Sequence, residues 1–225
     1  MADQQAEEDK KRQTVSPFST IYKMVLAKYP KTDKIYPWQN LLMRLINYRT
    51  VRDDFGHLKL VDDKEKIKES ETEGFLYVPR GRGLAFMSTF HKTQRKYDLL
   101  KTEFPADLTR EIKAYIRINK LEYGDYLFHQ ERSKSKPRGQ MSTSVAGMLK
   151  TAGVKDLQGV KNTGNFNLFR HARISEVAEK GMSANERQQL SEAMNHLPTT
   201  QVAYLRKVVC EKAYDPENIL PVNNK

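Results

Sequence analysis

The chain has 225 residues, of which 38% are hydrophobic, and a formal net charge of +11. A chain of this size and composition buries one core of good size, so we expect a single main domain. Lys and Arg outnumber Asp and Glu by 39 to 28, which favours a polyanionic partner, nucleic acid first and an anionic membrane second. No apolar run approaches the roughly 18 residues that span a bilayer, and the single cysteine, Cys210, excludes an internal disulfide framework.

The first residues, 1–16, are polar and aperiodic, which predicts a disordered leader. They begin MADQQAEEDKKRQ and lack the apolar stretch of a signal peptide, so we expect an intracellular protein that is not secreted. We assign residues 17–215 to one folded domain and residues 216–225 to a flexible tail.

Two helices are predicted at the start of the domain. Ile21, Met24 and Val25 form a short amphipathic piece, and apolar residues recur at helical spacing from Trp38 to Ile46. The second piece is the stronger pattern and predicts a core helix. The stretch from Arg49 to Leu60 and a charged loop, residues 62–74, separate these helices from the next part of the chain.

Three strands are predicted after this loop. Their sequences are GFLYVP (74–79), LAFMSTF (84–90) and YDLLKTEF (97–104). A turn around Gly81 and Gly83 joins the first two, and a polar turn joins the second and third. This pattern predicts a small three-stranded antiparallel sheet.

The remaining chain is predicted to be helical. Leu108, Ile112 and Ile116 share one helical face, and further helices are expected over 141–152 and 165–180, closed by Gly153 and Gly181. Ser183 and Glu186 form a capping box for the next helix, and Pro198 opens a last one. The expected class is therefore α+β, mainly helical with the small sheet on one side.

Side chains suited to phosphate chemistry follow one another in the C-terminal part. They are Asn167 and Arg170 in one segment, then Asn195 and His196, then Tyr204 eight residues after that histidine. Arginine offers a planar fork of donors that matches phosphate geometry. Histidine titrates near neutral pH, and a phenol attacks phosphorus once its proton is removed. This order predicts a DNA-cleavage site assembled from three helical segments.

Four motifs together resemble the catalytic domain of the tyrosine recombinases, or phage-type integrases, over residues 36–213. In chain order they are VRDDFGHLKL (51–60), FHKT (90–93), FRH (169–171) and MNHLPTTQ (194–201) followed by Tyr204. They are most similar to the integrases of large DNA viruses and phages. The resemblance implies five catalytic residues: Arg52, Lys92, Arg170, His196 and Tyr204.

The resemblance also implies a mechanism without ATP, metal or cofactor. Tyr204 would attack a phosphodiester and form a 3′-phosphotyrosyl link, while Arg52 and Arg170 stabilise the phosphate charge. Lys92 would protonate the leaving deoxyribose oxygen, and His196 would contact a phosphate oxygen or move the tyrosine proton. The implied function is that of a site-specific DNA recombinase or integrase.

The implied partner is double-stranded DNA, on which four protomers normally cooperate, so the protein is expected wherever that DNA lies and not at a membrane. Two other functions fit the same motifs. One is a DNA-relaxing activity similar to that of type IB topoisomerases, and the other is that of a catalytically silent DNA-binding relative.

Several positions have rivals in the sequence. Arg49 is an alternative to Arg52, and Arg95 and Lys96 are alternatives to Lys92. Arg173 is an alternative to Arg170, and Tyr214 is an alternative to Tyr204. Metal binding by the pairs Asp53–Asp54 and Asp62–Asp63 is an alternative interpretation of these carboxylates. The neighbouring lysines favour surface ion pairs instead.

The chain departs from the family at Asn167, where a histidine is most often found; an amide binds phosphate but cannot shuttle a proton. The roughly 35 residues before the matched region leave no room for the family's N-terminal helical clamp. Either the sequence is a fragment, or a partner or the protein's own oligomer is expected to help hold the DNA. The predicted DNA contacts are Asn167, Arg95, Lys134, Lys136 and Arg138. The last three belong to the basic segment 132–139, for which a solvated flexible loop is the alternative.

Overall fold

The structure is a computed structural model that describes residues 16–50, 55–67, 73–89, 100–138, 141–154, 166–181 and 183–194. The predicted leader apart from Ser16, the predicted last helix and the predicted tail lie outside these ranges. The helices are α2 (Phe18–Lys28), α3 (Trp38–Tyr48), α4 (Ala106–Ile118), α5 (Met141–Thr151), α6 (Phe166–Glu179) and α7 (Ala184–Ala193). The strands are β1 (Leu58–Val61), β2 (Gly74–Tyr77), β3 (Phe86–Thr89), β4 (Leu100–Glu103), β5 (His129–Gln130) and β6 (Ser133–Pro137). The predicted α+β class is confirmed.

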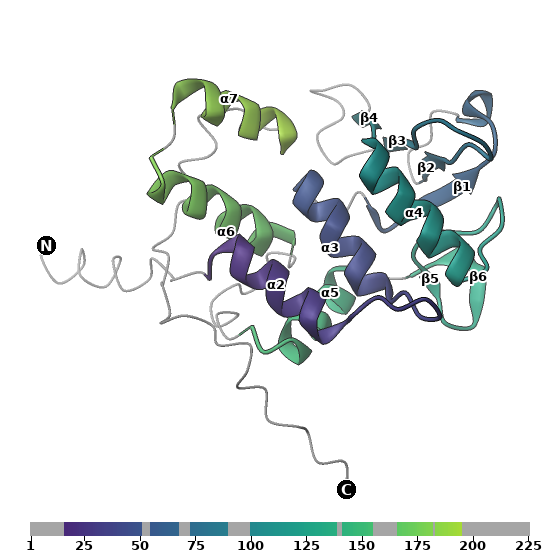
Figure 1. Cartoon of the computed structure of the whole chain (residues 1–225), viewed down its shortest axis with the longest axis horizontal. Helices are drawn as coiled ribbons and strands as arrows, with labels where there is room; N and C mark the ends of the chain where they lie inside the picture. Colours follow the sequence, from purple (N-terminus) through teal and green to yellow (C-terminus); the bar gives the residue numbers. More distant parts are fainter. Residues whose placement is uncertain are drawn as a thin grey trace, which may run out of the picture.

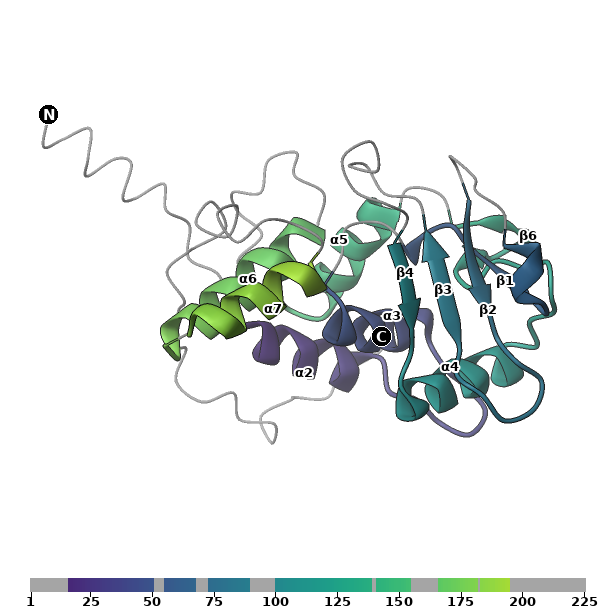
Figure 2. The same cartoon turned by 90° about the horizontal axis from the view of Figure 1, so that it is seen from above.

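The described elements form two parts along the long axis of the molecule. Figure 1 shows α2, α5, α6 and α7 on one side and the sheet with α4 on the other, and Figure 2 shows the same division from above. Helix α3 lies between them and contacts both α2 and α4. None of the described helices combines the length and the apolar character needed to cross a membrane.

The main sheet has the order β1-β2-β3-β4. Strands β2, β3 and β4 pair antiparallel, as predicted. A fourth strand, β1, was not predicted, and it pairs parallel to β2. Gly74 at the start of β2 allows a close approach, because a Cβ there would lie 2.8 Å from Cγ2 of Thr89.

The basic segment 132–139 is largely a strand and not the flexible loop that was its alternative. Its residues Ser133–Pro137 form β6, which pairs antiparallel with β5. The amide of Arg138 donates to the carbonyl of Phe128, 2.8 Å away. These backbone hydrogen bonds fix the backbone positions of Lys134, Lys136 and Arg138.

One core joins the helices to the sheet. The predicted face of α3 is buried, with Leu41, Leu42 and Ile46 fully inaccessible to solvent. Each such side chain contributes about 1.5–3 kcal/mol to folding. The same cluster includes large side chains from the strands, from residues next to them and from α6: Phe55, Leu76, Met87, Phe104, Phe128, Phe166 and Phe169.

The predicted helix ends are confirmed where the structure describes them. Gly153 and Gly181 follow α5 and α6 with φ of 80° and 77°, a left-handed conformation that favours glycine. At the start of α7, the Ser183 hydroxyl donates to the Glu186 carboxylate at 2.7 Å, and the Glu186 amide donates back to that hydroxyl at 3.3 Å. This is the predicted capping box.

Glu111 on α4 joins the segment before α3 to the sheet side of the molecule. Its Oε2 accepts hydrogen bonds from the Tyr36 hydroxyl at 2.7 Å and from the Lys31 ammonium at 2.9 Å. Burial alone would raise the pKa of Glu111, but the bonds from Tyr36 and Lys31 and the charge of Arg44 outweigh it and lower that pKa. Burial and then the Glu111 carboxylate raise the pKa of Tyr36.

We predict that Glu111→Gln destabilises the protein at pH 7 and that this effect fades in acid. Because the folded state lowers the pKa of Glu111, the carboxylate's contribution is fully present above its unfolded pKa and is lost as pH falls through the folded pKa. Urea unfolding at pH 7, 5 and 3 measures this difference from wild type. The control is Glu122→Gln, at an exposed carboxylate. An equal loss of stability at pH 3 and pH 7 for Glu111→Gln would contradict the assignment.

Candidate functional site

Arg170 is held against the segment that carries the predicted histidine. It lies on α6, and its side chain is buried, at 4% exposure. Its Nη2 donates a hydrogen bond to the carbonyl of Met194, 2.7 Å away. Met194 directly precedes Asn195 and His196 in the chain. The structure thus brings the second-arginine helix into contact with the start of the terminal motif.

Aromatic packing holds α6 in this position. Phe169 is fully buried and meets Phe18 of α2 edge to face, with ring centroids 6.3 Å apart. Phe166, one turn earlier, packs on Phe169 in the same manner at 6.2 Å. These contacts bury one side of α6 against α2. That packing fixes the position of α6 along its axis and its rotation, and therefore the position of Arg170.

Arg173, the predicted rival of Arg170, ties α6 to the end of α3. Its Nη1 donates to the backbone carbonyl of Asn47 at 2.9 Å and to the Asn47 side-chain oxygen at 3.2 Å. The guanidinium also lies over the ring of Phe18, 5.1 Å from its centroid. Burial lowers the pKa of Arg173, and the charge of Glu176 partly opposes this. Since the last carbonyls of a helix lack helical partners, Arg173 caps α3.

Arg49 continues this chain of contacts to the sheet. It follows α3 directly, and its Nη1 donates to the hydroxyl of Thr102 on β4 at 2.9 Å. The neighbouring Tyr48 donates its hydroxyl to the carbonyl of Glu103 at 3.2 Å. The end of α3 is therefore fixed both to α6 and to β4.

Strand β4 belongs to the hairpin predicted around Lys92. Strands β3 and β4 pair antiparallel with Thr89 opposite Leu100, and the ten residues 90–99 connect them. Segment 51–54, which contains Arg52, begins two residues after Arg49. Contacts among described residues thus link the elements that flank all four predicted motifs.

Several predicted residues lie outside the described part of the chain. They are the catalytic candidates Arg52, Lys92, His196 and Tyr204, the DNA-contact candidate Arg95, and the alternatives Lys96, Tyr214, Asp53 and Asp54. Among the described candidates, Asn167 is half-buried in the first turn of α6, three residues before Arg170. It therefore stands on the same helix and one turn away from the guanidinium.

The three basic candidates near β6 differ in their surroundings. The Lys134 ammonium donates to the carbonyl of Lys120, and Lys136 is exposed. The Arg138 guanidinium lies over the indole of Trp38, 4.7 Å from the ring centroid. Sequence reasoning missed this stacking, because the two residues are far apart in the chain and neither carries a local signal for the other.

The described acidic pair Asp62–Asp63 is engaged in local contacts. Asp62 forms an ion pair with Lys66, and the Asp63 carboxylate accepts a hydrogen bond from the Glu65 amide at 3.0 Å. Ion pairing with a neighbouring lysine was the interpretation that the sequence favoured for this pair. Within the described ranges, no three His, Cys, Asp or Glu side chains gather closely enough to hold a metal ion.

Comparison of the structure with solved structures finds a crystal structure of XerA recombinase, with a TM-score of 0.51 and 13% sequence identity. The match covers 85% of this chain and 59% of the XerA recombinase chain. The chain has a tyrosine-recombinase-like fold. At this identity the likeness establishes the fold alone. No protein-family model matches the sequence, and no curated protein matches it.

We predict that Arg173→Met lowers the free energy of unfolding by about 2 kcal/mol, because the Asn47 carbonyl then loses its charged donor while the apolar stem is kept. Urea unfolding of both proteins measures the difference. Arg117→Met is the matched control: Arg117 is exposed on α4, so its loss should stay within about 0.5 kcal/mol. Equal effects of the two substitutions would show that the Arg173 contact does not hold α6 to α3.

Proposed function

We propose that this protein is a site-specific DNA recombinase of the integrase type, which breaks and rejoins DNA strands through a covalent 3′-phosphotyrosyl intermediate at Tyr204. The observation that carries the proposal is the contact between Arg170 and Met194 within a recombinase-like fold. It places a guanidinium suited to phosphate next to the segment that leads to His196 and Tyr204.

The chemistry follows from the residue types. The phenol oxygen of Tyr204 attacks phosphorus, a new P–O bond forms, and the bond to the 5′ oxygen breaks. Lys92 gives that leaving oxygen its proton, and His196 hydrogen-bonds a phosphate oxygen or takes the phenol proton. Arg52 and Arg170 stabilise the charge that develops on the phosphate oxygens, with Asn167 as a further donor. Attack by a 5′ hydroxyl on the phosphotyrosine reverses the steps and reseals a strand.

Access to Arg170 requires a rearrangement. The side chain is only 4% exposed, and its Nη2 donates to the Met194 carbonyl. A phosphate can therefore reach the guanidinium only after the surroundings of Arg170 shift. This fits a reaction in which several protomers assemble on double-stranded DNA, wherever in the cell that DNA lies.

We predict that the protein forms a covalent adduct with a nicked suicide oligonucleotide in the presence of EDTA, and that Tyr204→Phe abolishes it. The phenol oxygen is the attacking atom, and side chains supply the charge stabilisation. A denaturing gel measures the adduct. Tyr214→Phe is the matched control and should keep it. An adduct with Tyr204→Phe would reject the nucleophile, and strict magnesium dependence would point instead to carboxylates such as Asp53 and Asp54.

Arg52→Ala and Arg49→Ala should separate catalysis from structure. Arg52→Ala should slow adduct formation by about 10²–10³-fold, the usual cost of removing one group that stabilises transition-state charge, with little change in stability. Arg49→Ala should lower the urea midpoint, because Thr102 loses its charged donor. Single-turnover adduct kinetics and urea unfolding are measured on both variants. Loss of the adduct with Arg49→Ala alone would reverse the assignment.

A further inference from the structure

The outer side of α4 carries a row of basic side chains. Arg110, Lys113, Arg117 and Lys120 are spaced by three, four and three residues, so they follow one face of the helix and its C-terminal end. Arg110, Arg117 and Lys120 are exposed, and Lys113 is half-buried. From Arg110 to Arg117 the row is about 10 Å long at the helical rise of about 1.5 Å per residue.

The turn between β2 and β3 extends this row. The Lys113 ammonium donates to the carbonyl of Gly81 at 2.7 Å, which places the exposed Arg80 and Arg82 beside α4. The Arg80 guanidinium lies over the ring of Tyr123, 5.4 Å from its centroid. We call these six residues the α4 basic surface: Arg80, Arg82, Arg110, Lys113, Arg117 and Lys120.

The positive charge of this surface is not cancelled by ion pairs within the described part of the chain. The described ion pairs engage Lys31, Arg44, Lys59, Lys66 and Lys180, and none of the six residues. Of the nearby carboxylates, Glu111 is bound by Tyr36 and Lys31. Asp62, which acts on Arg80 through its charge, is paired with Lys66. Asp107 is exposed in the first turn of α4.

The surface lies apart from Arg170, although Arg110 borders the same pocket as Asn47 and Tyr48 at the end of α3. Strand β3 runs from the β2–β3 turn to Thr89, which pairs with Leu100 at the start of β4, so the turn and these two strand ends lie at opposite ends of the sheet. Helices α6 and α7 lie beyond α3 in both views (Figures 1 and 2). A ligand on α4 therefore does not occupy the surroundings of Arg170.

Five of these six cations are exposed, and none forms an ion pair among the described residues. Such a row suits a polyanion with closely spaced charges, and duplex DNA carries one charge per about 1.7 Å of its axis. We propose that the α4 basic surface binds the phosphate backbone of a second stretch of DNA, away from the strand held at the candidate site. The proposal rests on the proposed function in taking DNA as the partner. It adds a second contact face, through which one protomer holds DNA at two places.

The test is the salt dependence of binding to a long duplex of random sequence, measured with the full chain. Arg110→Gln/Arg117→Gln should reduce the slope of log K against log salt by about 1.8, because each phosphate that a cation neutralises adds about 0.9 to that slope. Wild type should then lose about tenfold more affinity than the variant between 50 and 200 mM salt. Unfolding midpoints confirm that both proteins are folded.

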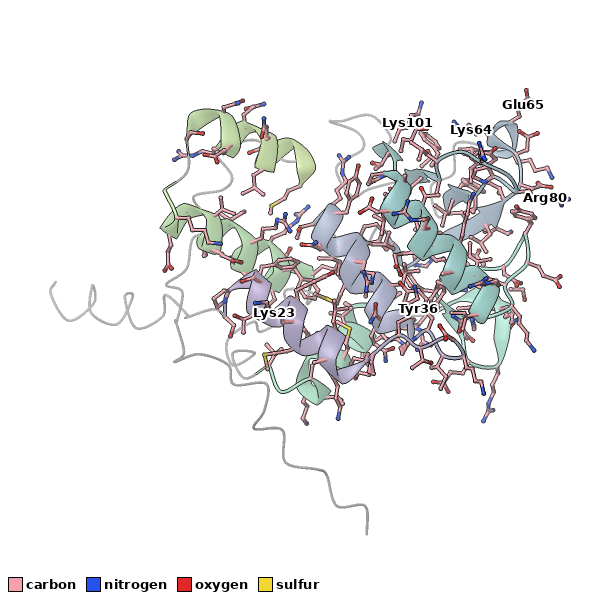
Figure 3. The ribbon with its side chains drawn as sticks, in the orientation of Figure 1. Lys23, Tyr36, Lys64, Glu65, Arg80 and Lys101 are labelled. Atoms are coloured by element: carbon pink, nitrogen blue, oxygen red, sulfur yellow. The ribbon has the colours of Figure 1, made fainter. Side chains whose placement is uncertain are left out.

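The matched control is Lys23→Gln/Lys28→Gln, which removes the same net charge from exposed positions of α2. Figure 3 shows Lys23 at the opposite side of the molecule from Arg80. The control should leave the slope unchanged. If the slope falls equally in both double variants, net charge alone determines the salt dependence. If the slope of Arg110→Gln/Arg117→Gln is unchanged but this variant loses binding to anionic vesicles, the surface binds a membrane. Either result overturns the proposal.

The adduct assay distinguishes this proposal from the proposed function. At low salt and saturating nicked oligonucleotide, Arg110→Gln/Arg117→Gln should form the adduct as wild type does, because Arg170 and the hairpin strands are untouched. Absence of an adduct from wild type would reject the recombinase function while leaving the salt slope to decide on the surface. Loss of the adduct in the variant alone would place α4 in the candidate site and contradict a separate contact.

Discussion

The capping of α3 by Arg173 is the contact on which the arrangement of the candidate site depends. A guanidinium from α6 meets the carbonyl end of α3, where the helix dipole favours positive charge. Because Arg49 then ties the same helix end to Thr102, α6, α3 and β4 are fixed relative to one another by two side chains. The packing of Phe169 on Phe18 sets the distance at which these bonds form. A shift of α6 along its axis would break the Arg173 bond to the end of α3 and would move Arg170 at the same time.

Four described hydrogen bonds at this junction have neutral acceptors. Arg170 donates to a carbonyl, Arg173 to a carbonyl and an amide oxygen, and Arg49 to a hydroxyl. Such acceptors satisfy the hydrogen-bonding geometry of a guanidinium without neutralising its charge. A carboxylate acceptor would satisfy the geometry and also neutralise the charge. These four hydrogen bonds therefore orient the three guanidinium groups without themselves neutralising them.

The sequence predicts the elements better than their contacts. Periodicity, the glycines at 153 and 181 and the Ser183–Glu186 box define the helices, because these signals are local in the chain. The parallel pairing of β1 depends on a partner after a long charged loop, and four residues are too few to show a period. The motif order indicates Arg170 and the terminal segment, but not the bond between them. Arg173–Asn47 and Arg138–Trp38 join residues far apart in the chain, so no local pattern predicts either.

Described contacts hold both ends of helix α7. A capping box fixes its start, the Arg170 bond lies at its last turn, and most of its described side chains face solvent. The exposed stretch 185–189 of α7 gains little from packing, whereas Ser191 and Met194 are buried. Release of the Arg170 bond at Met194 would therefore loosen the contact between α6 and the C-terminal end of α7, while the capping box at the start of α7 stays in place.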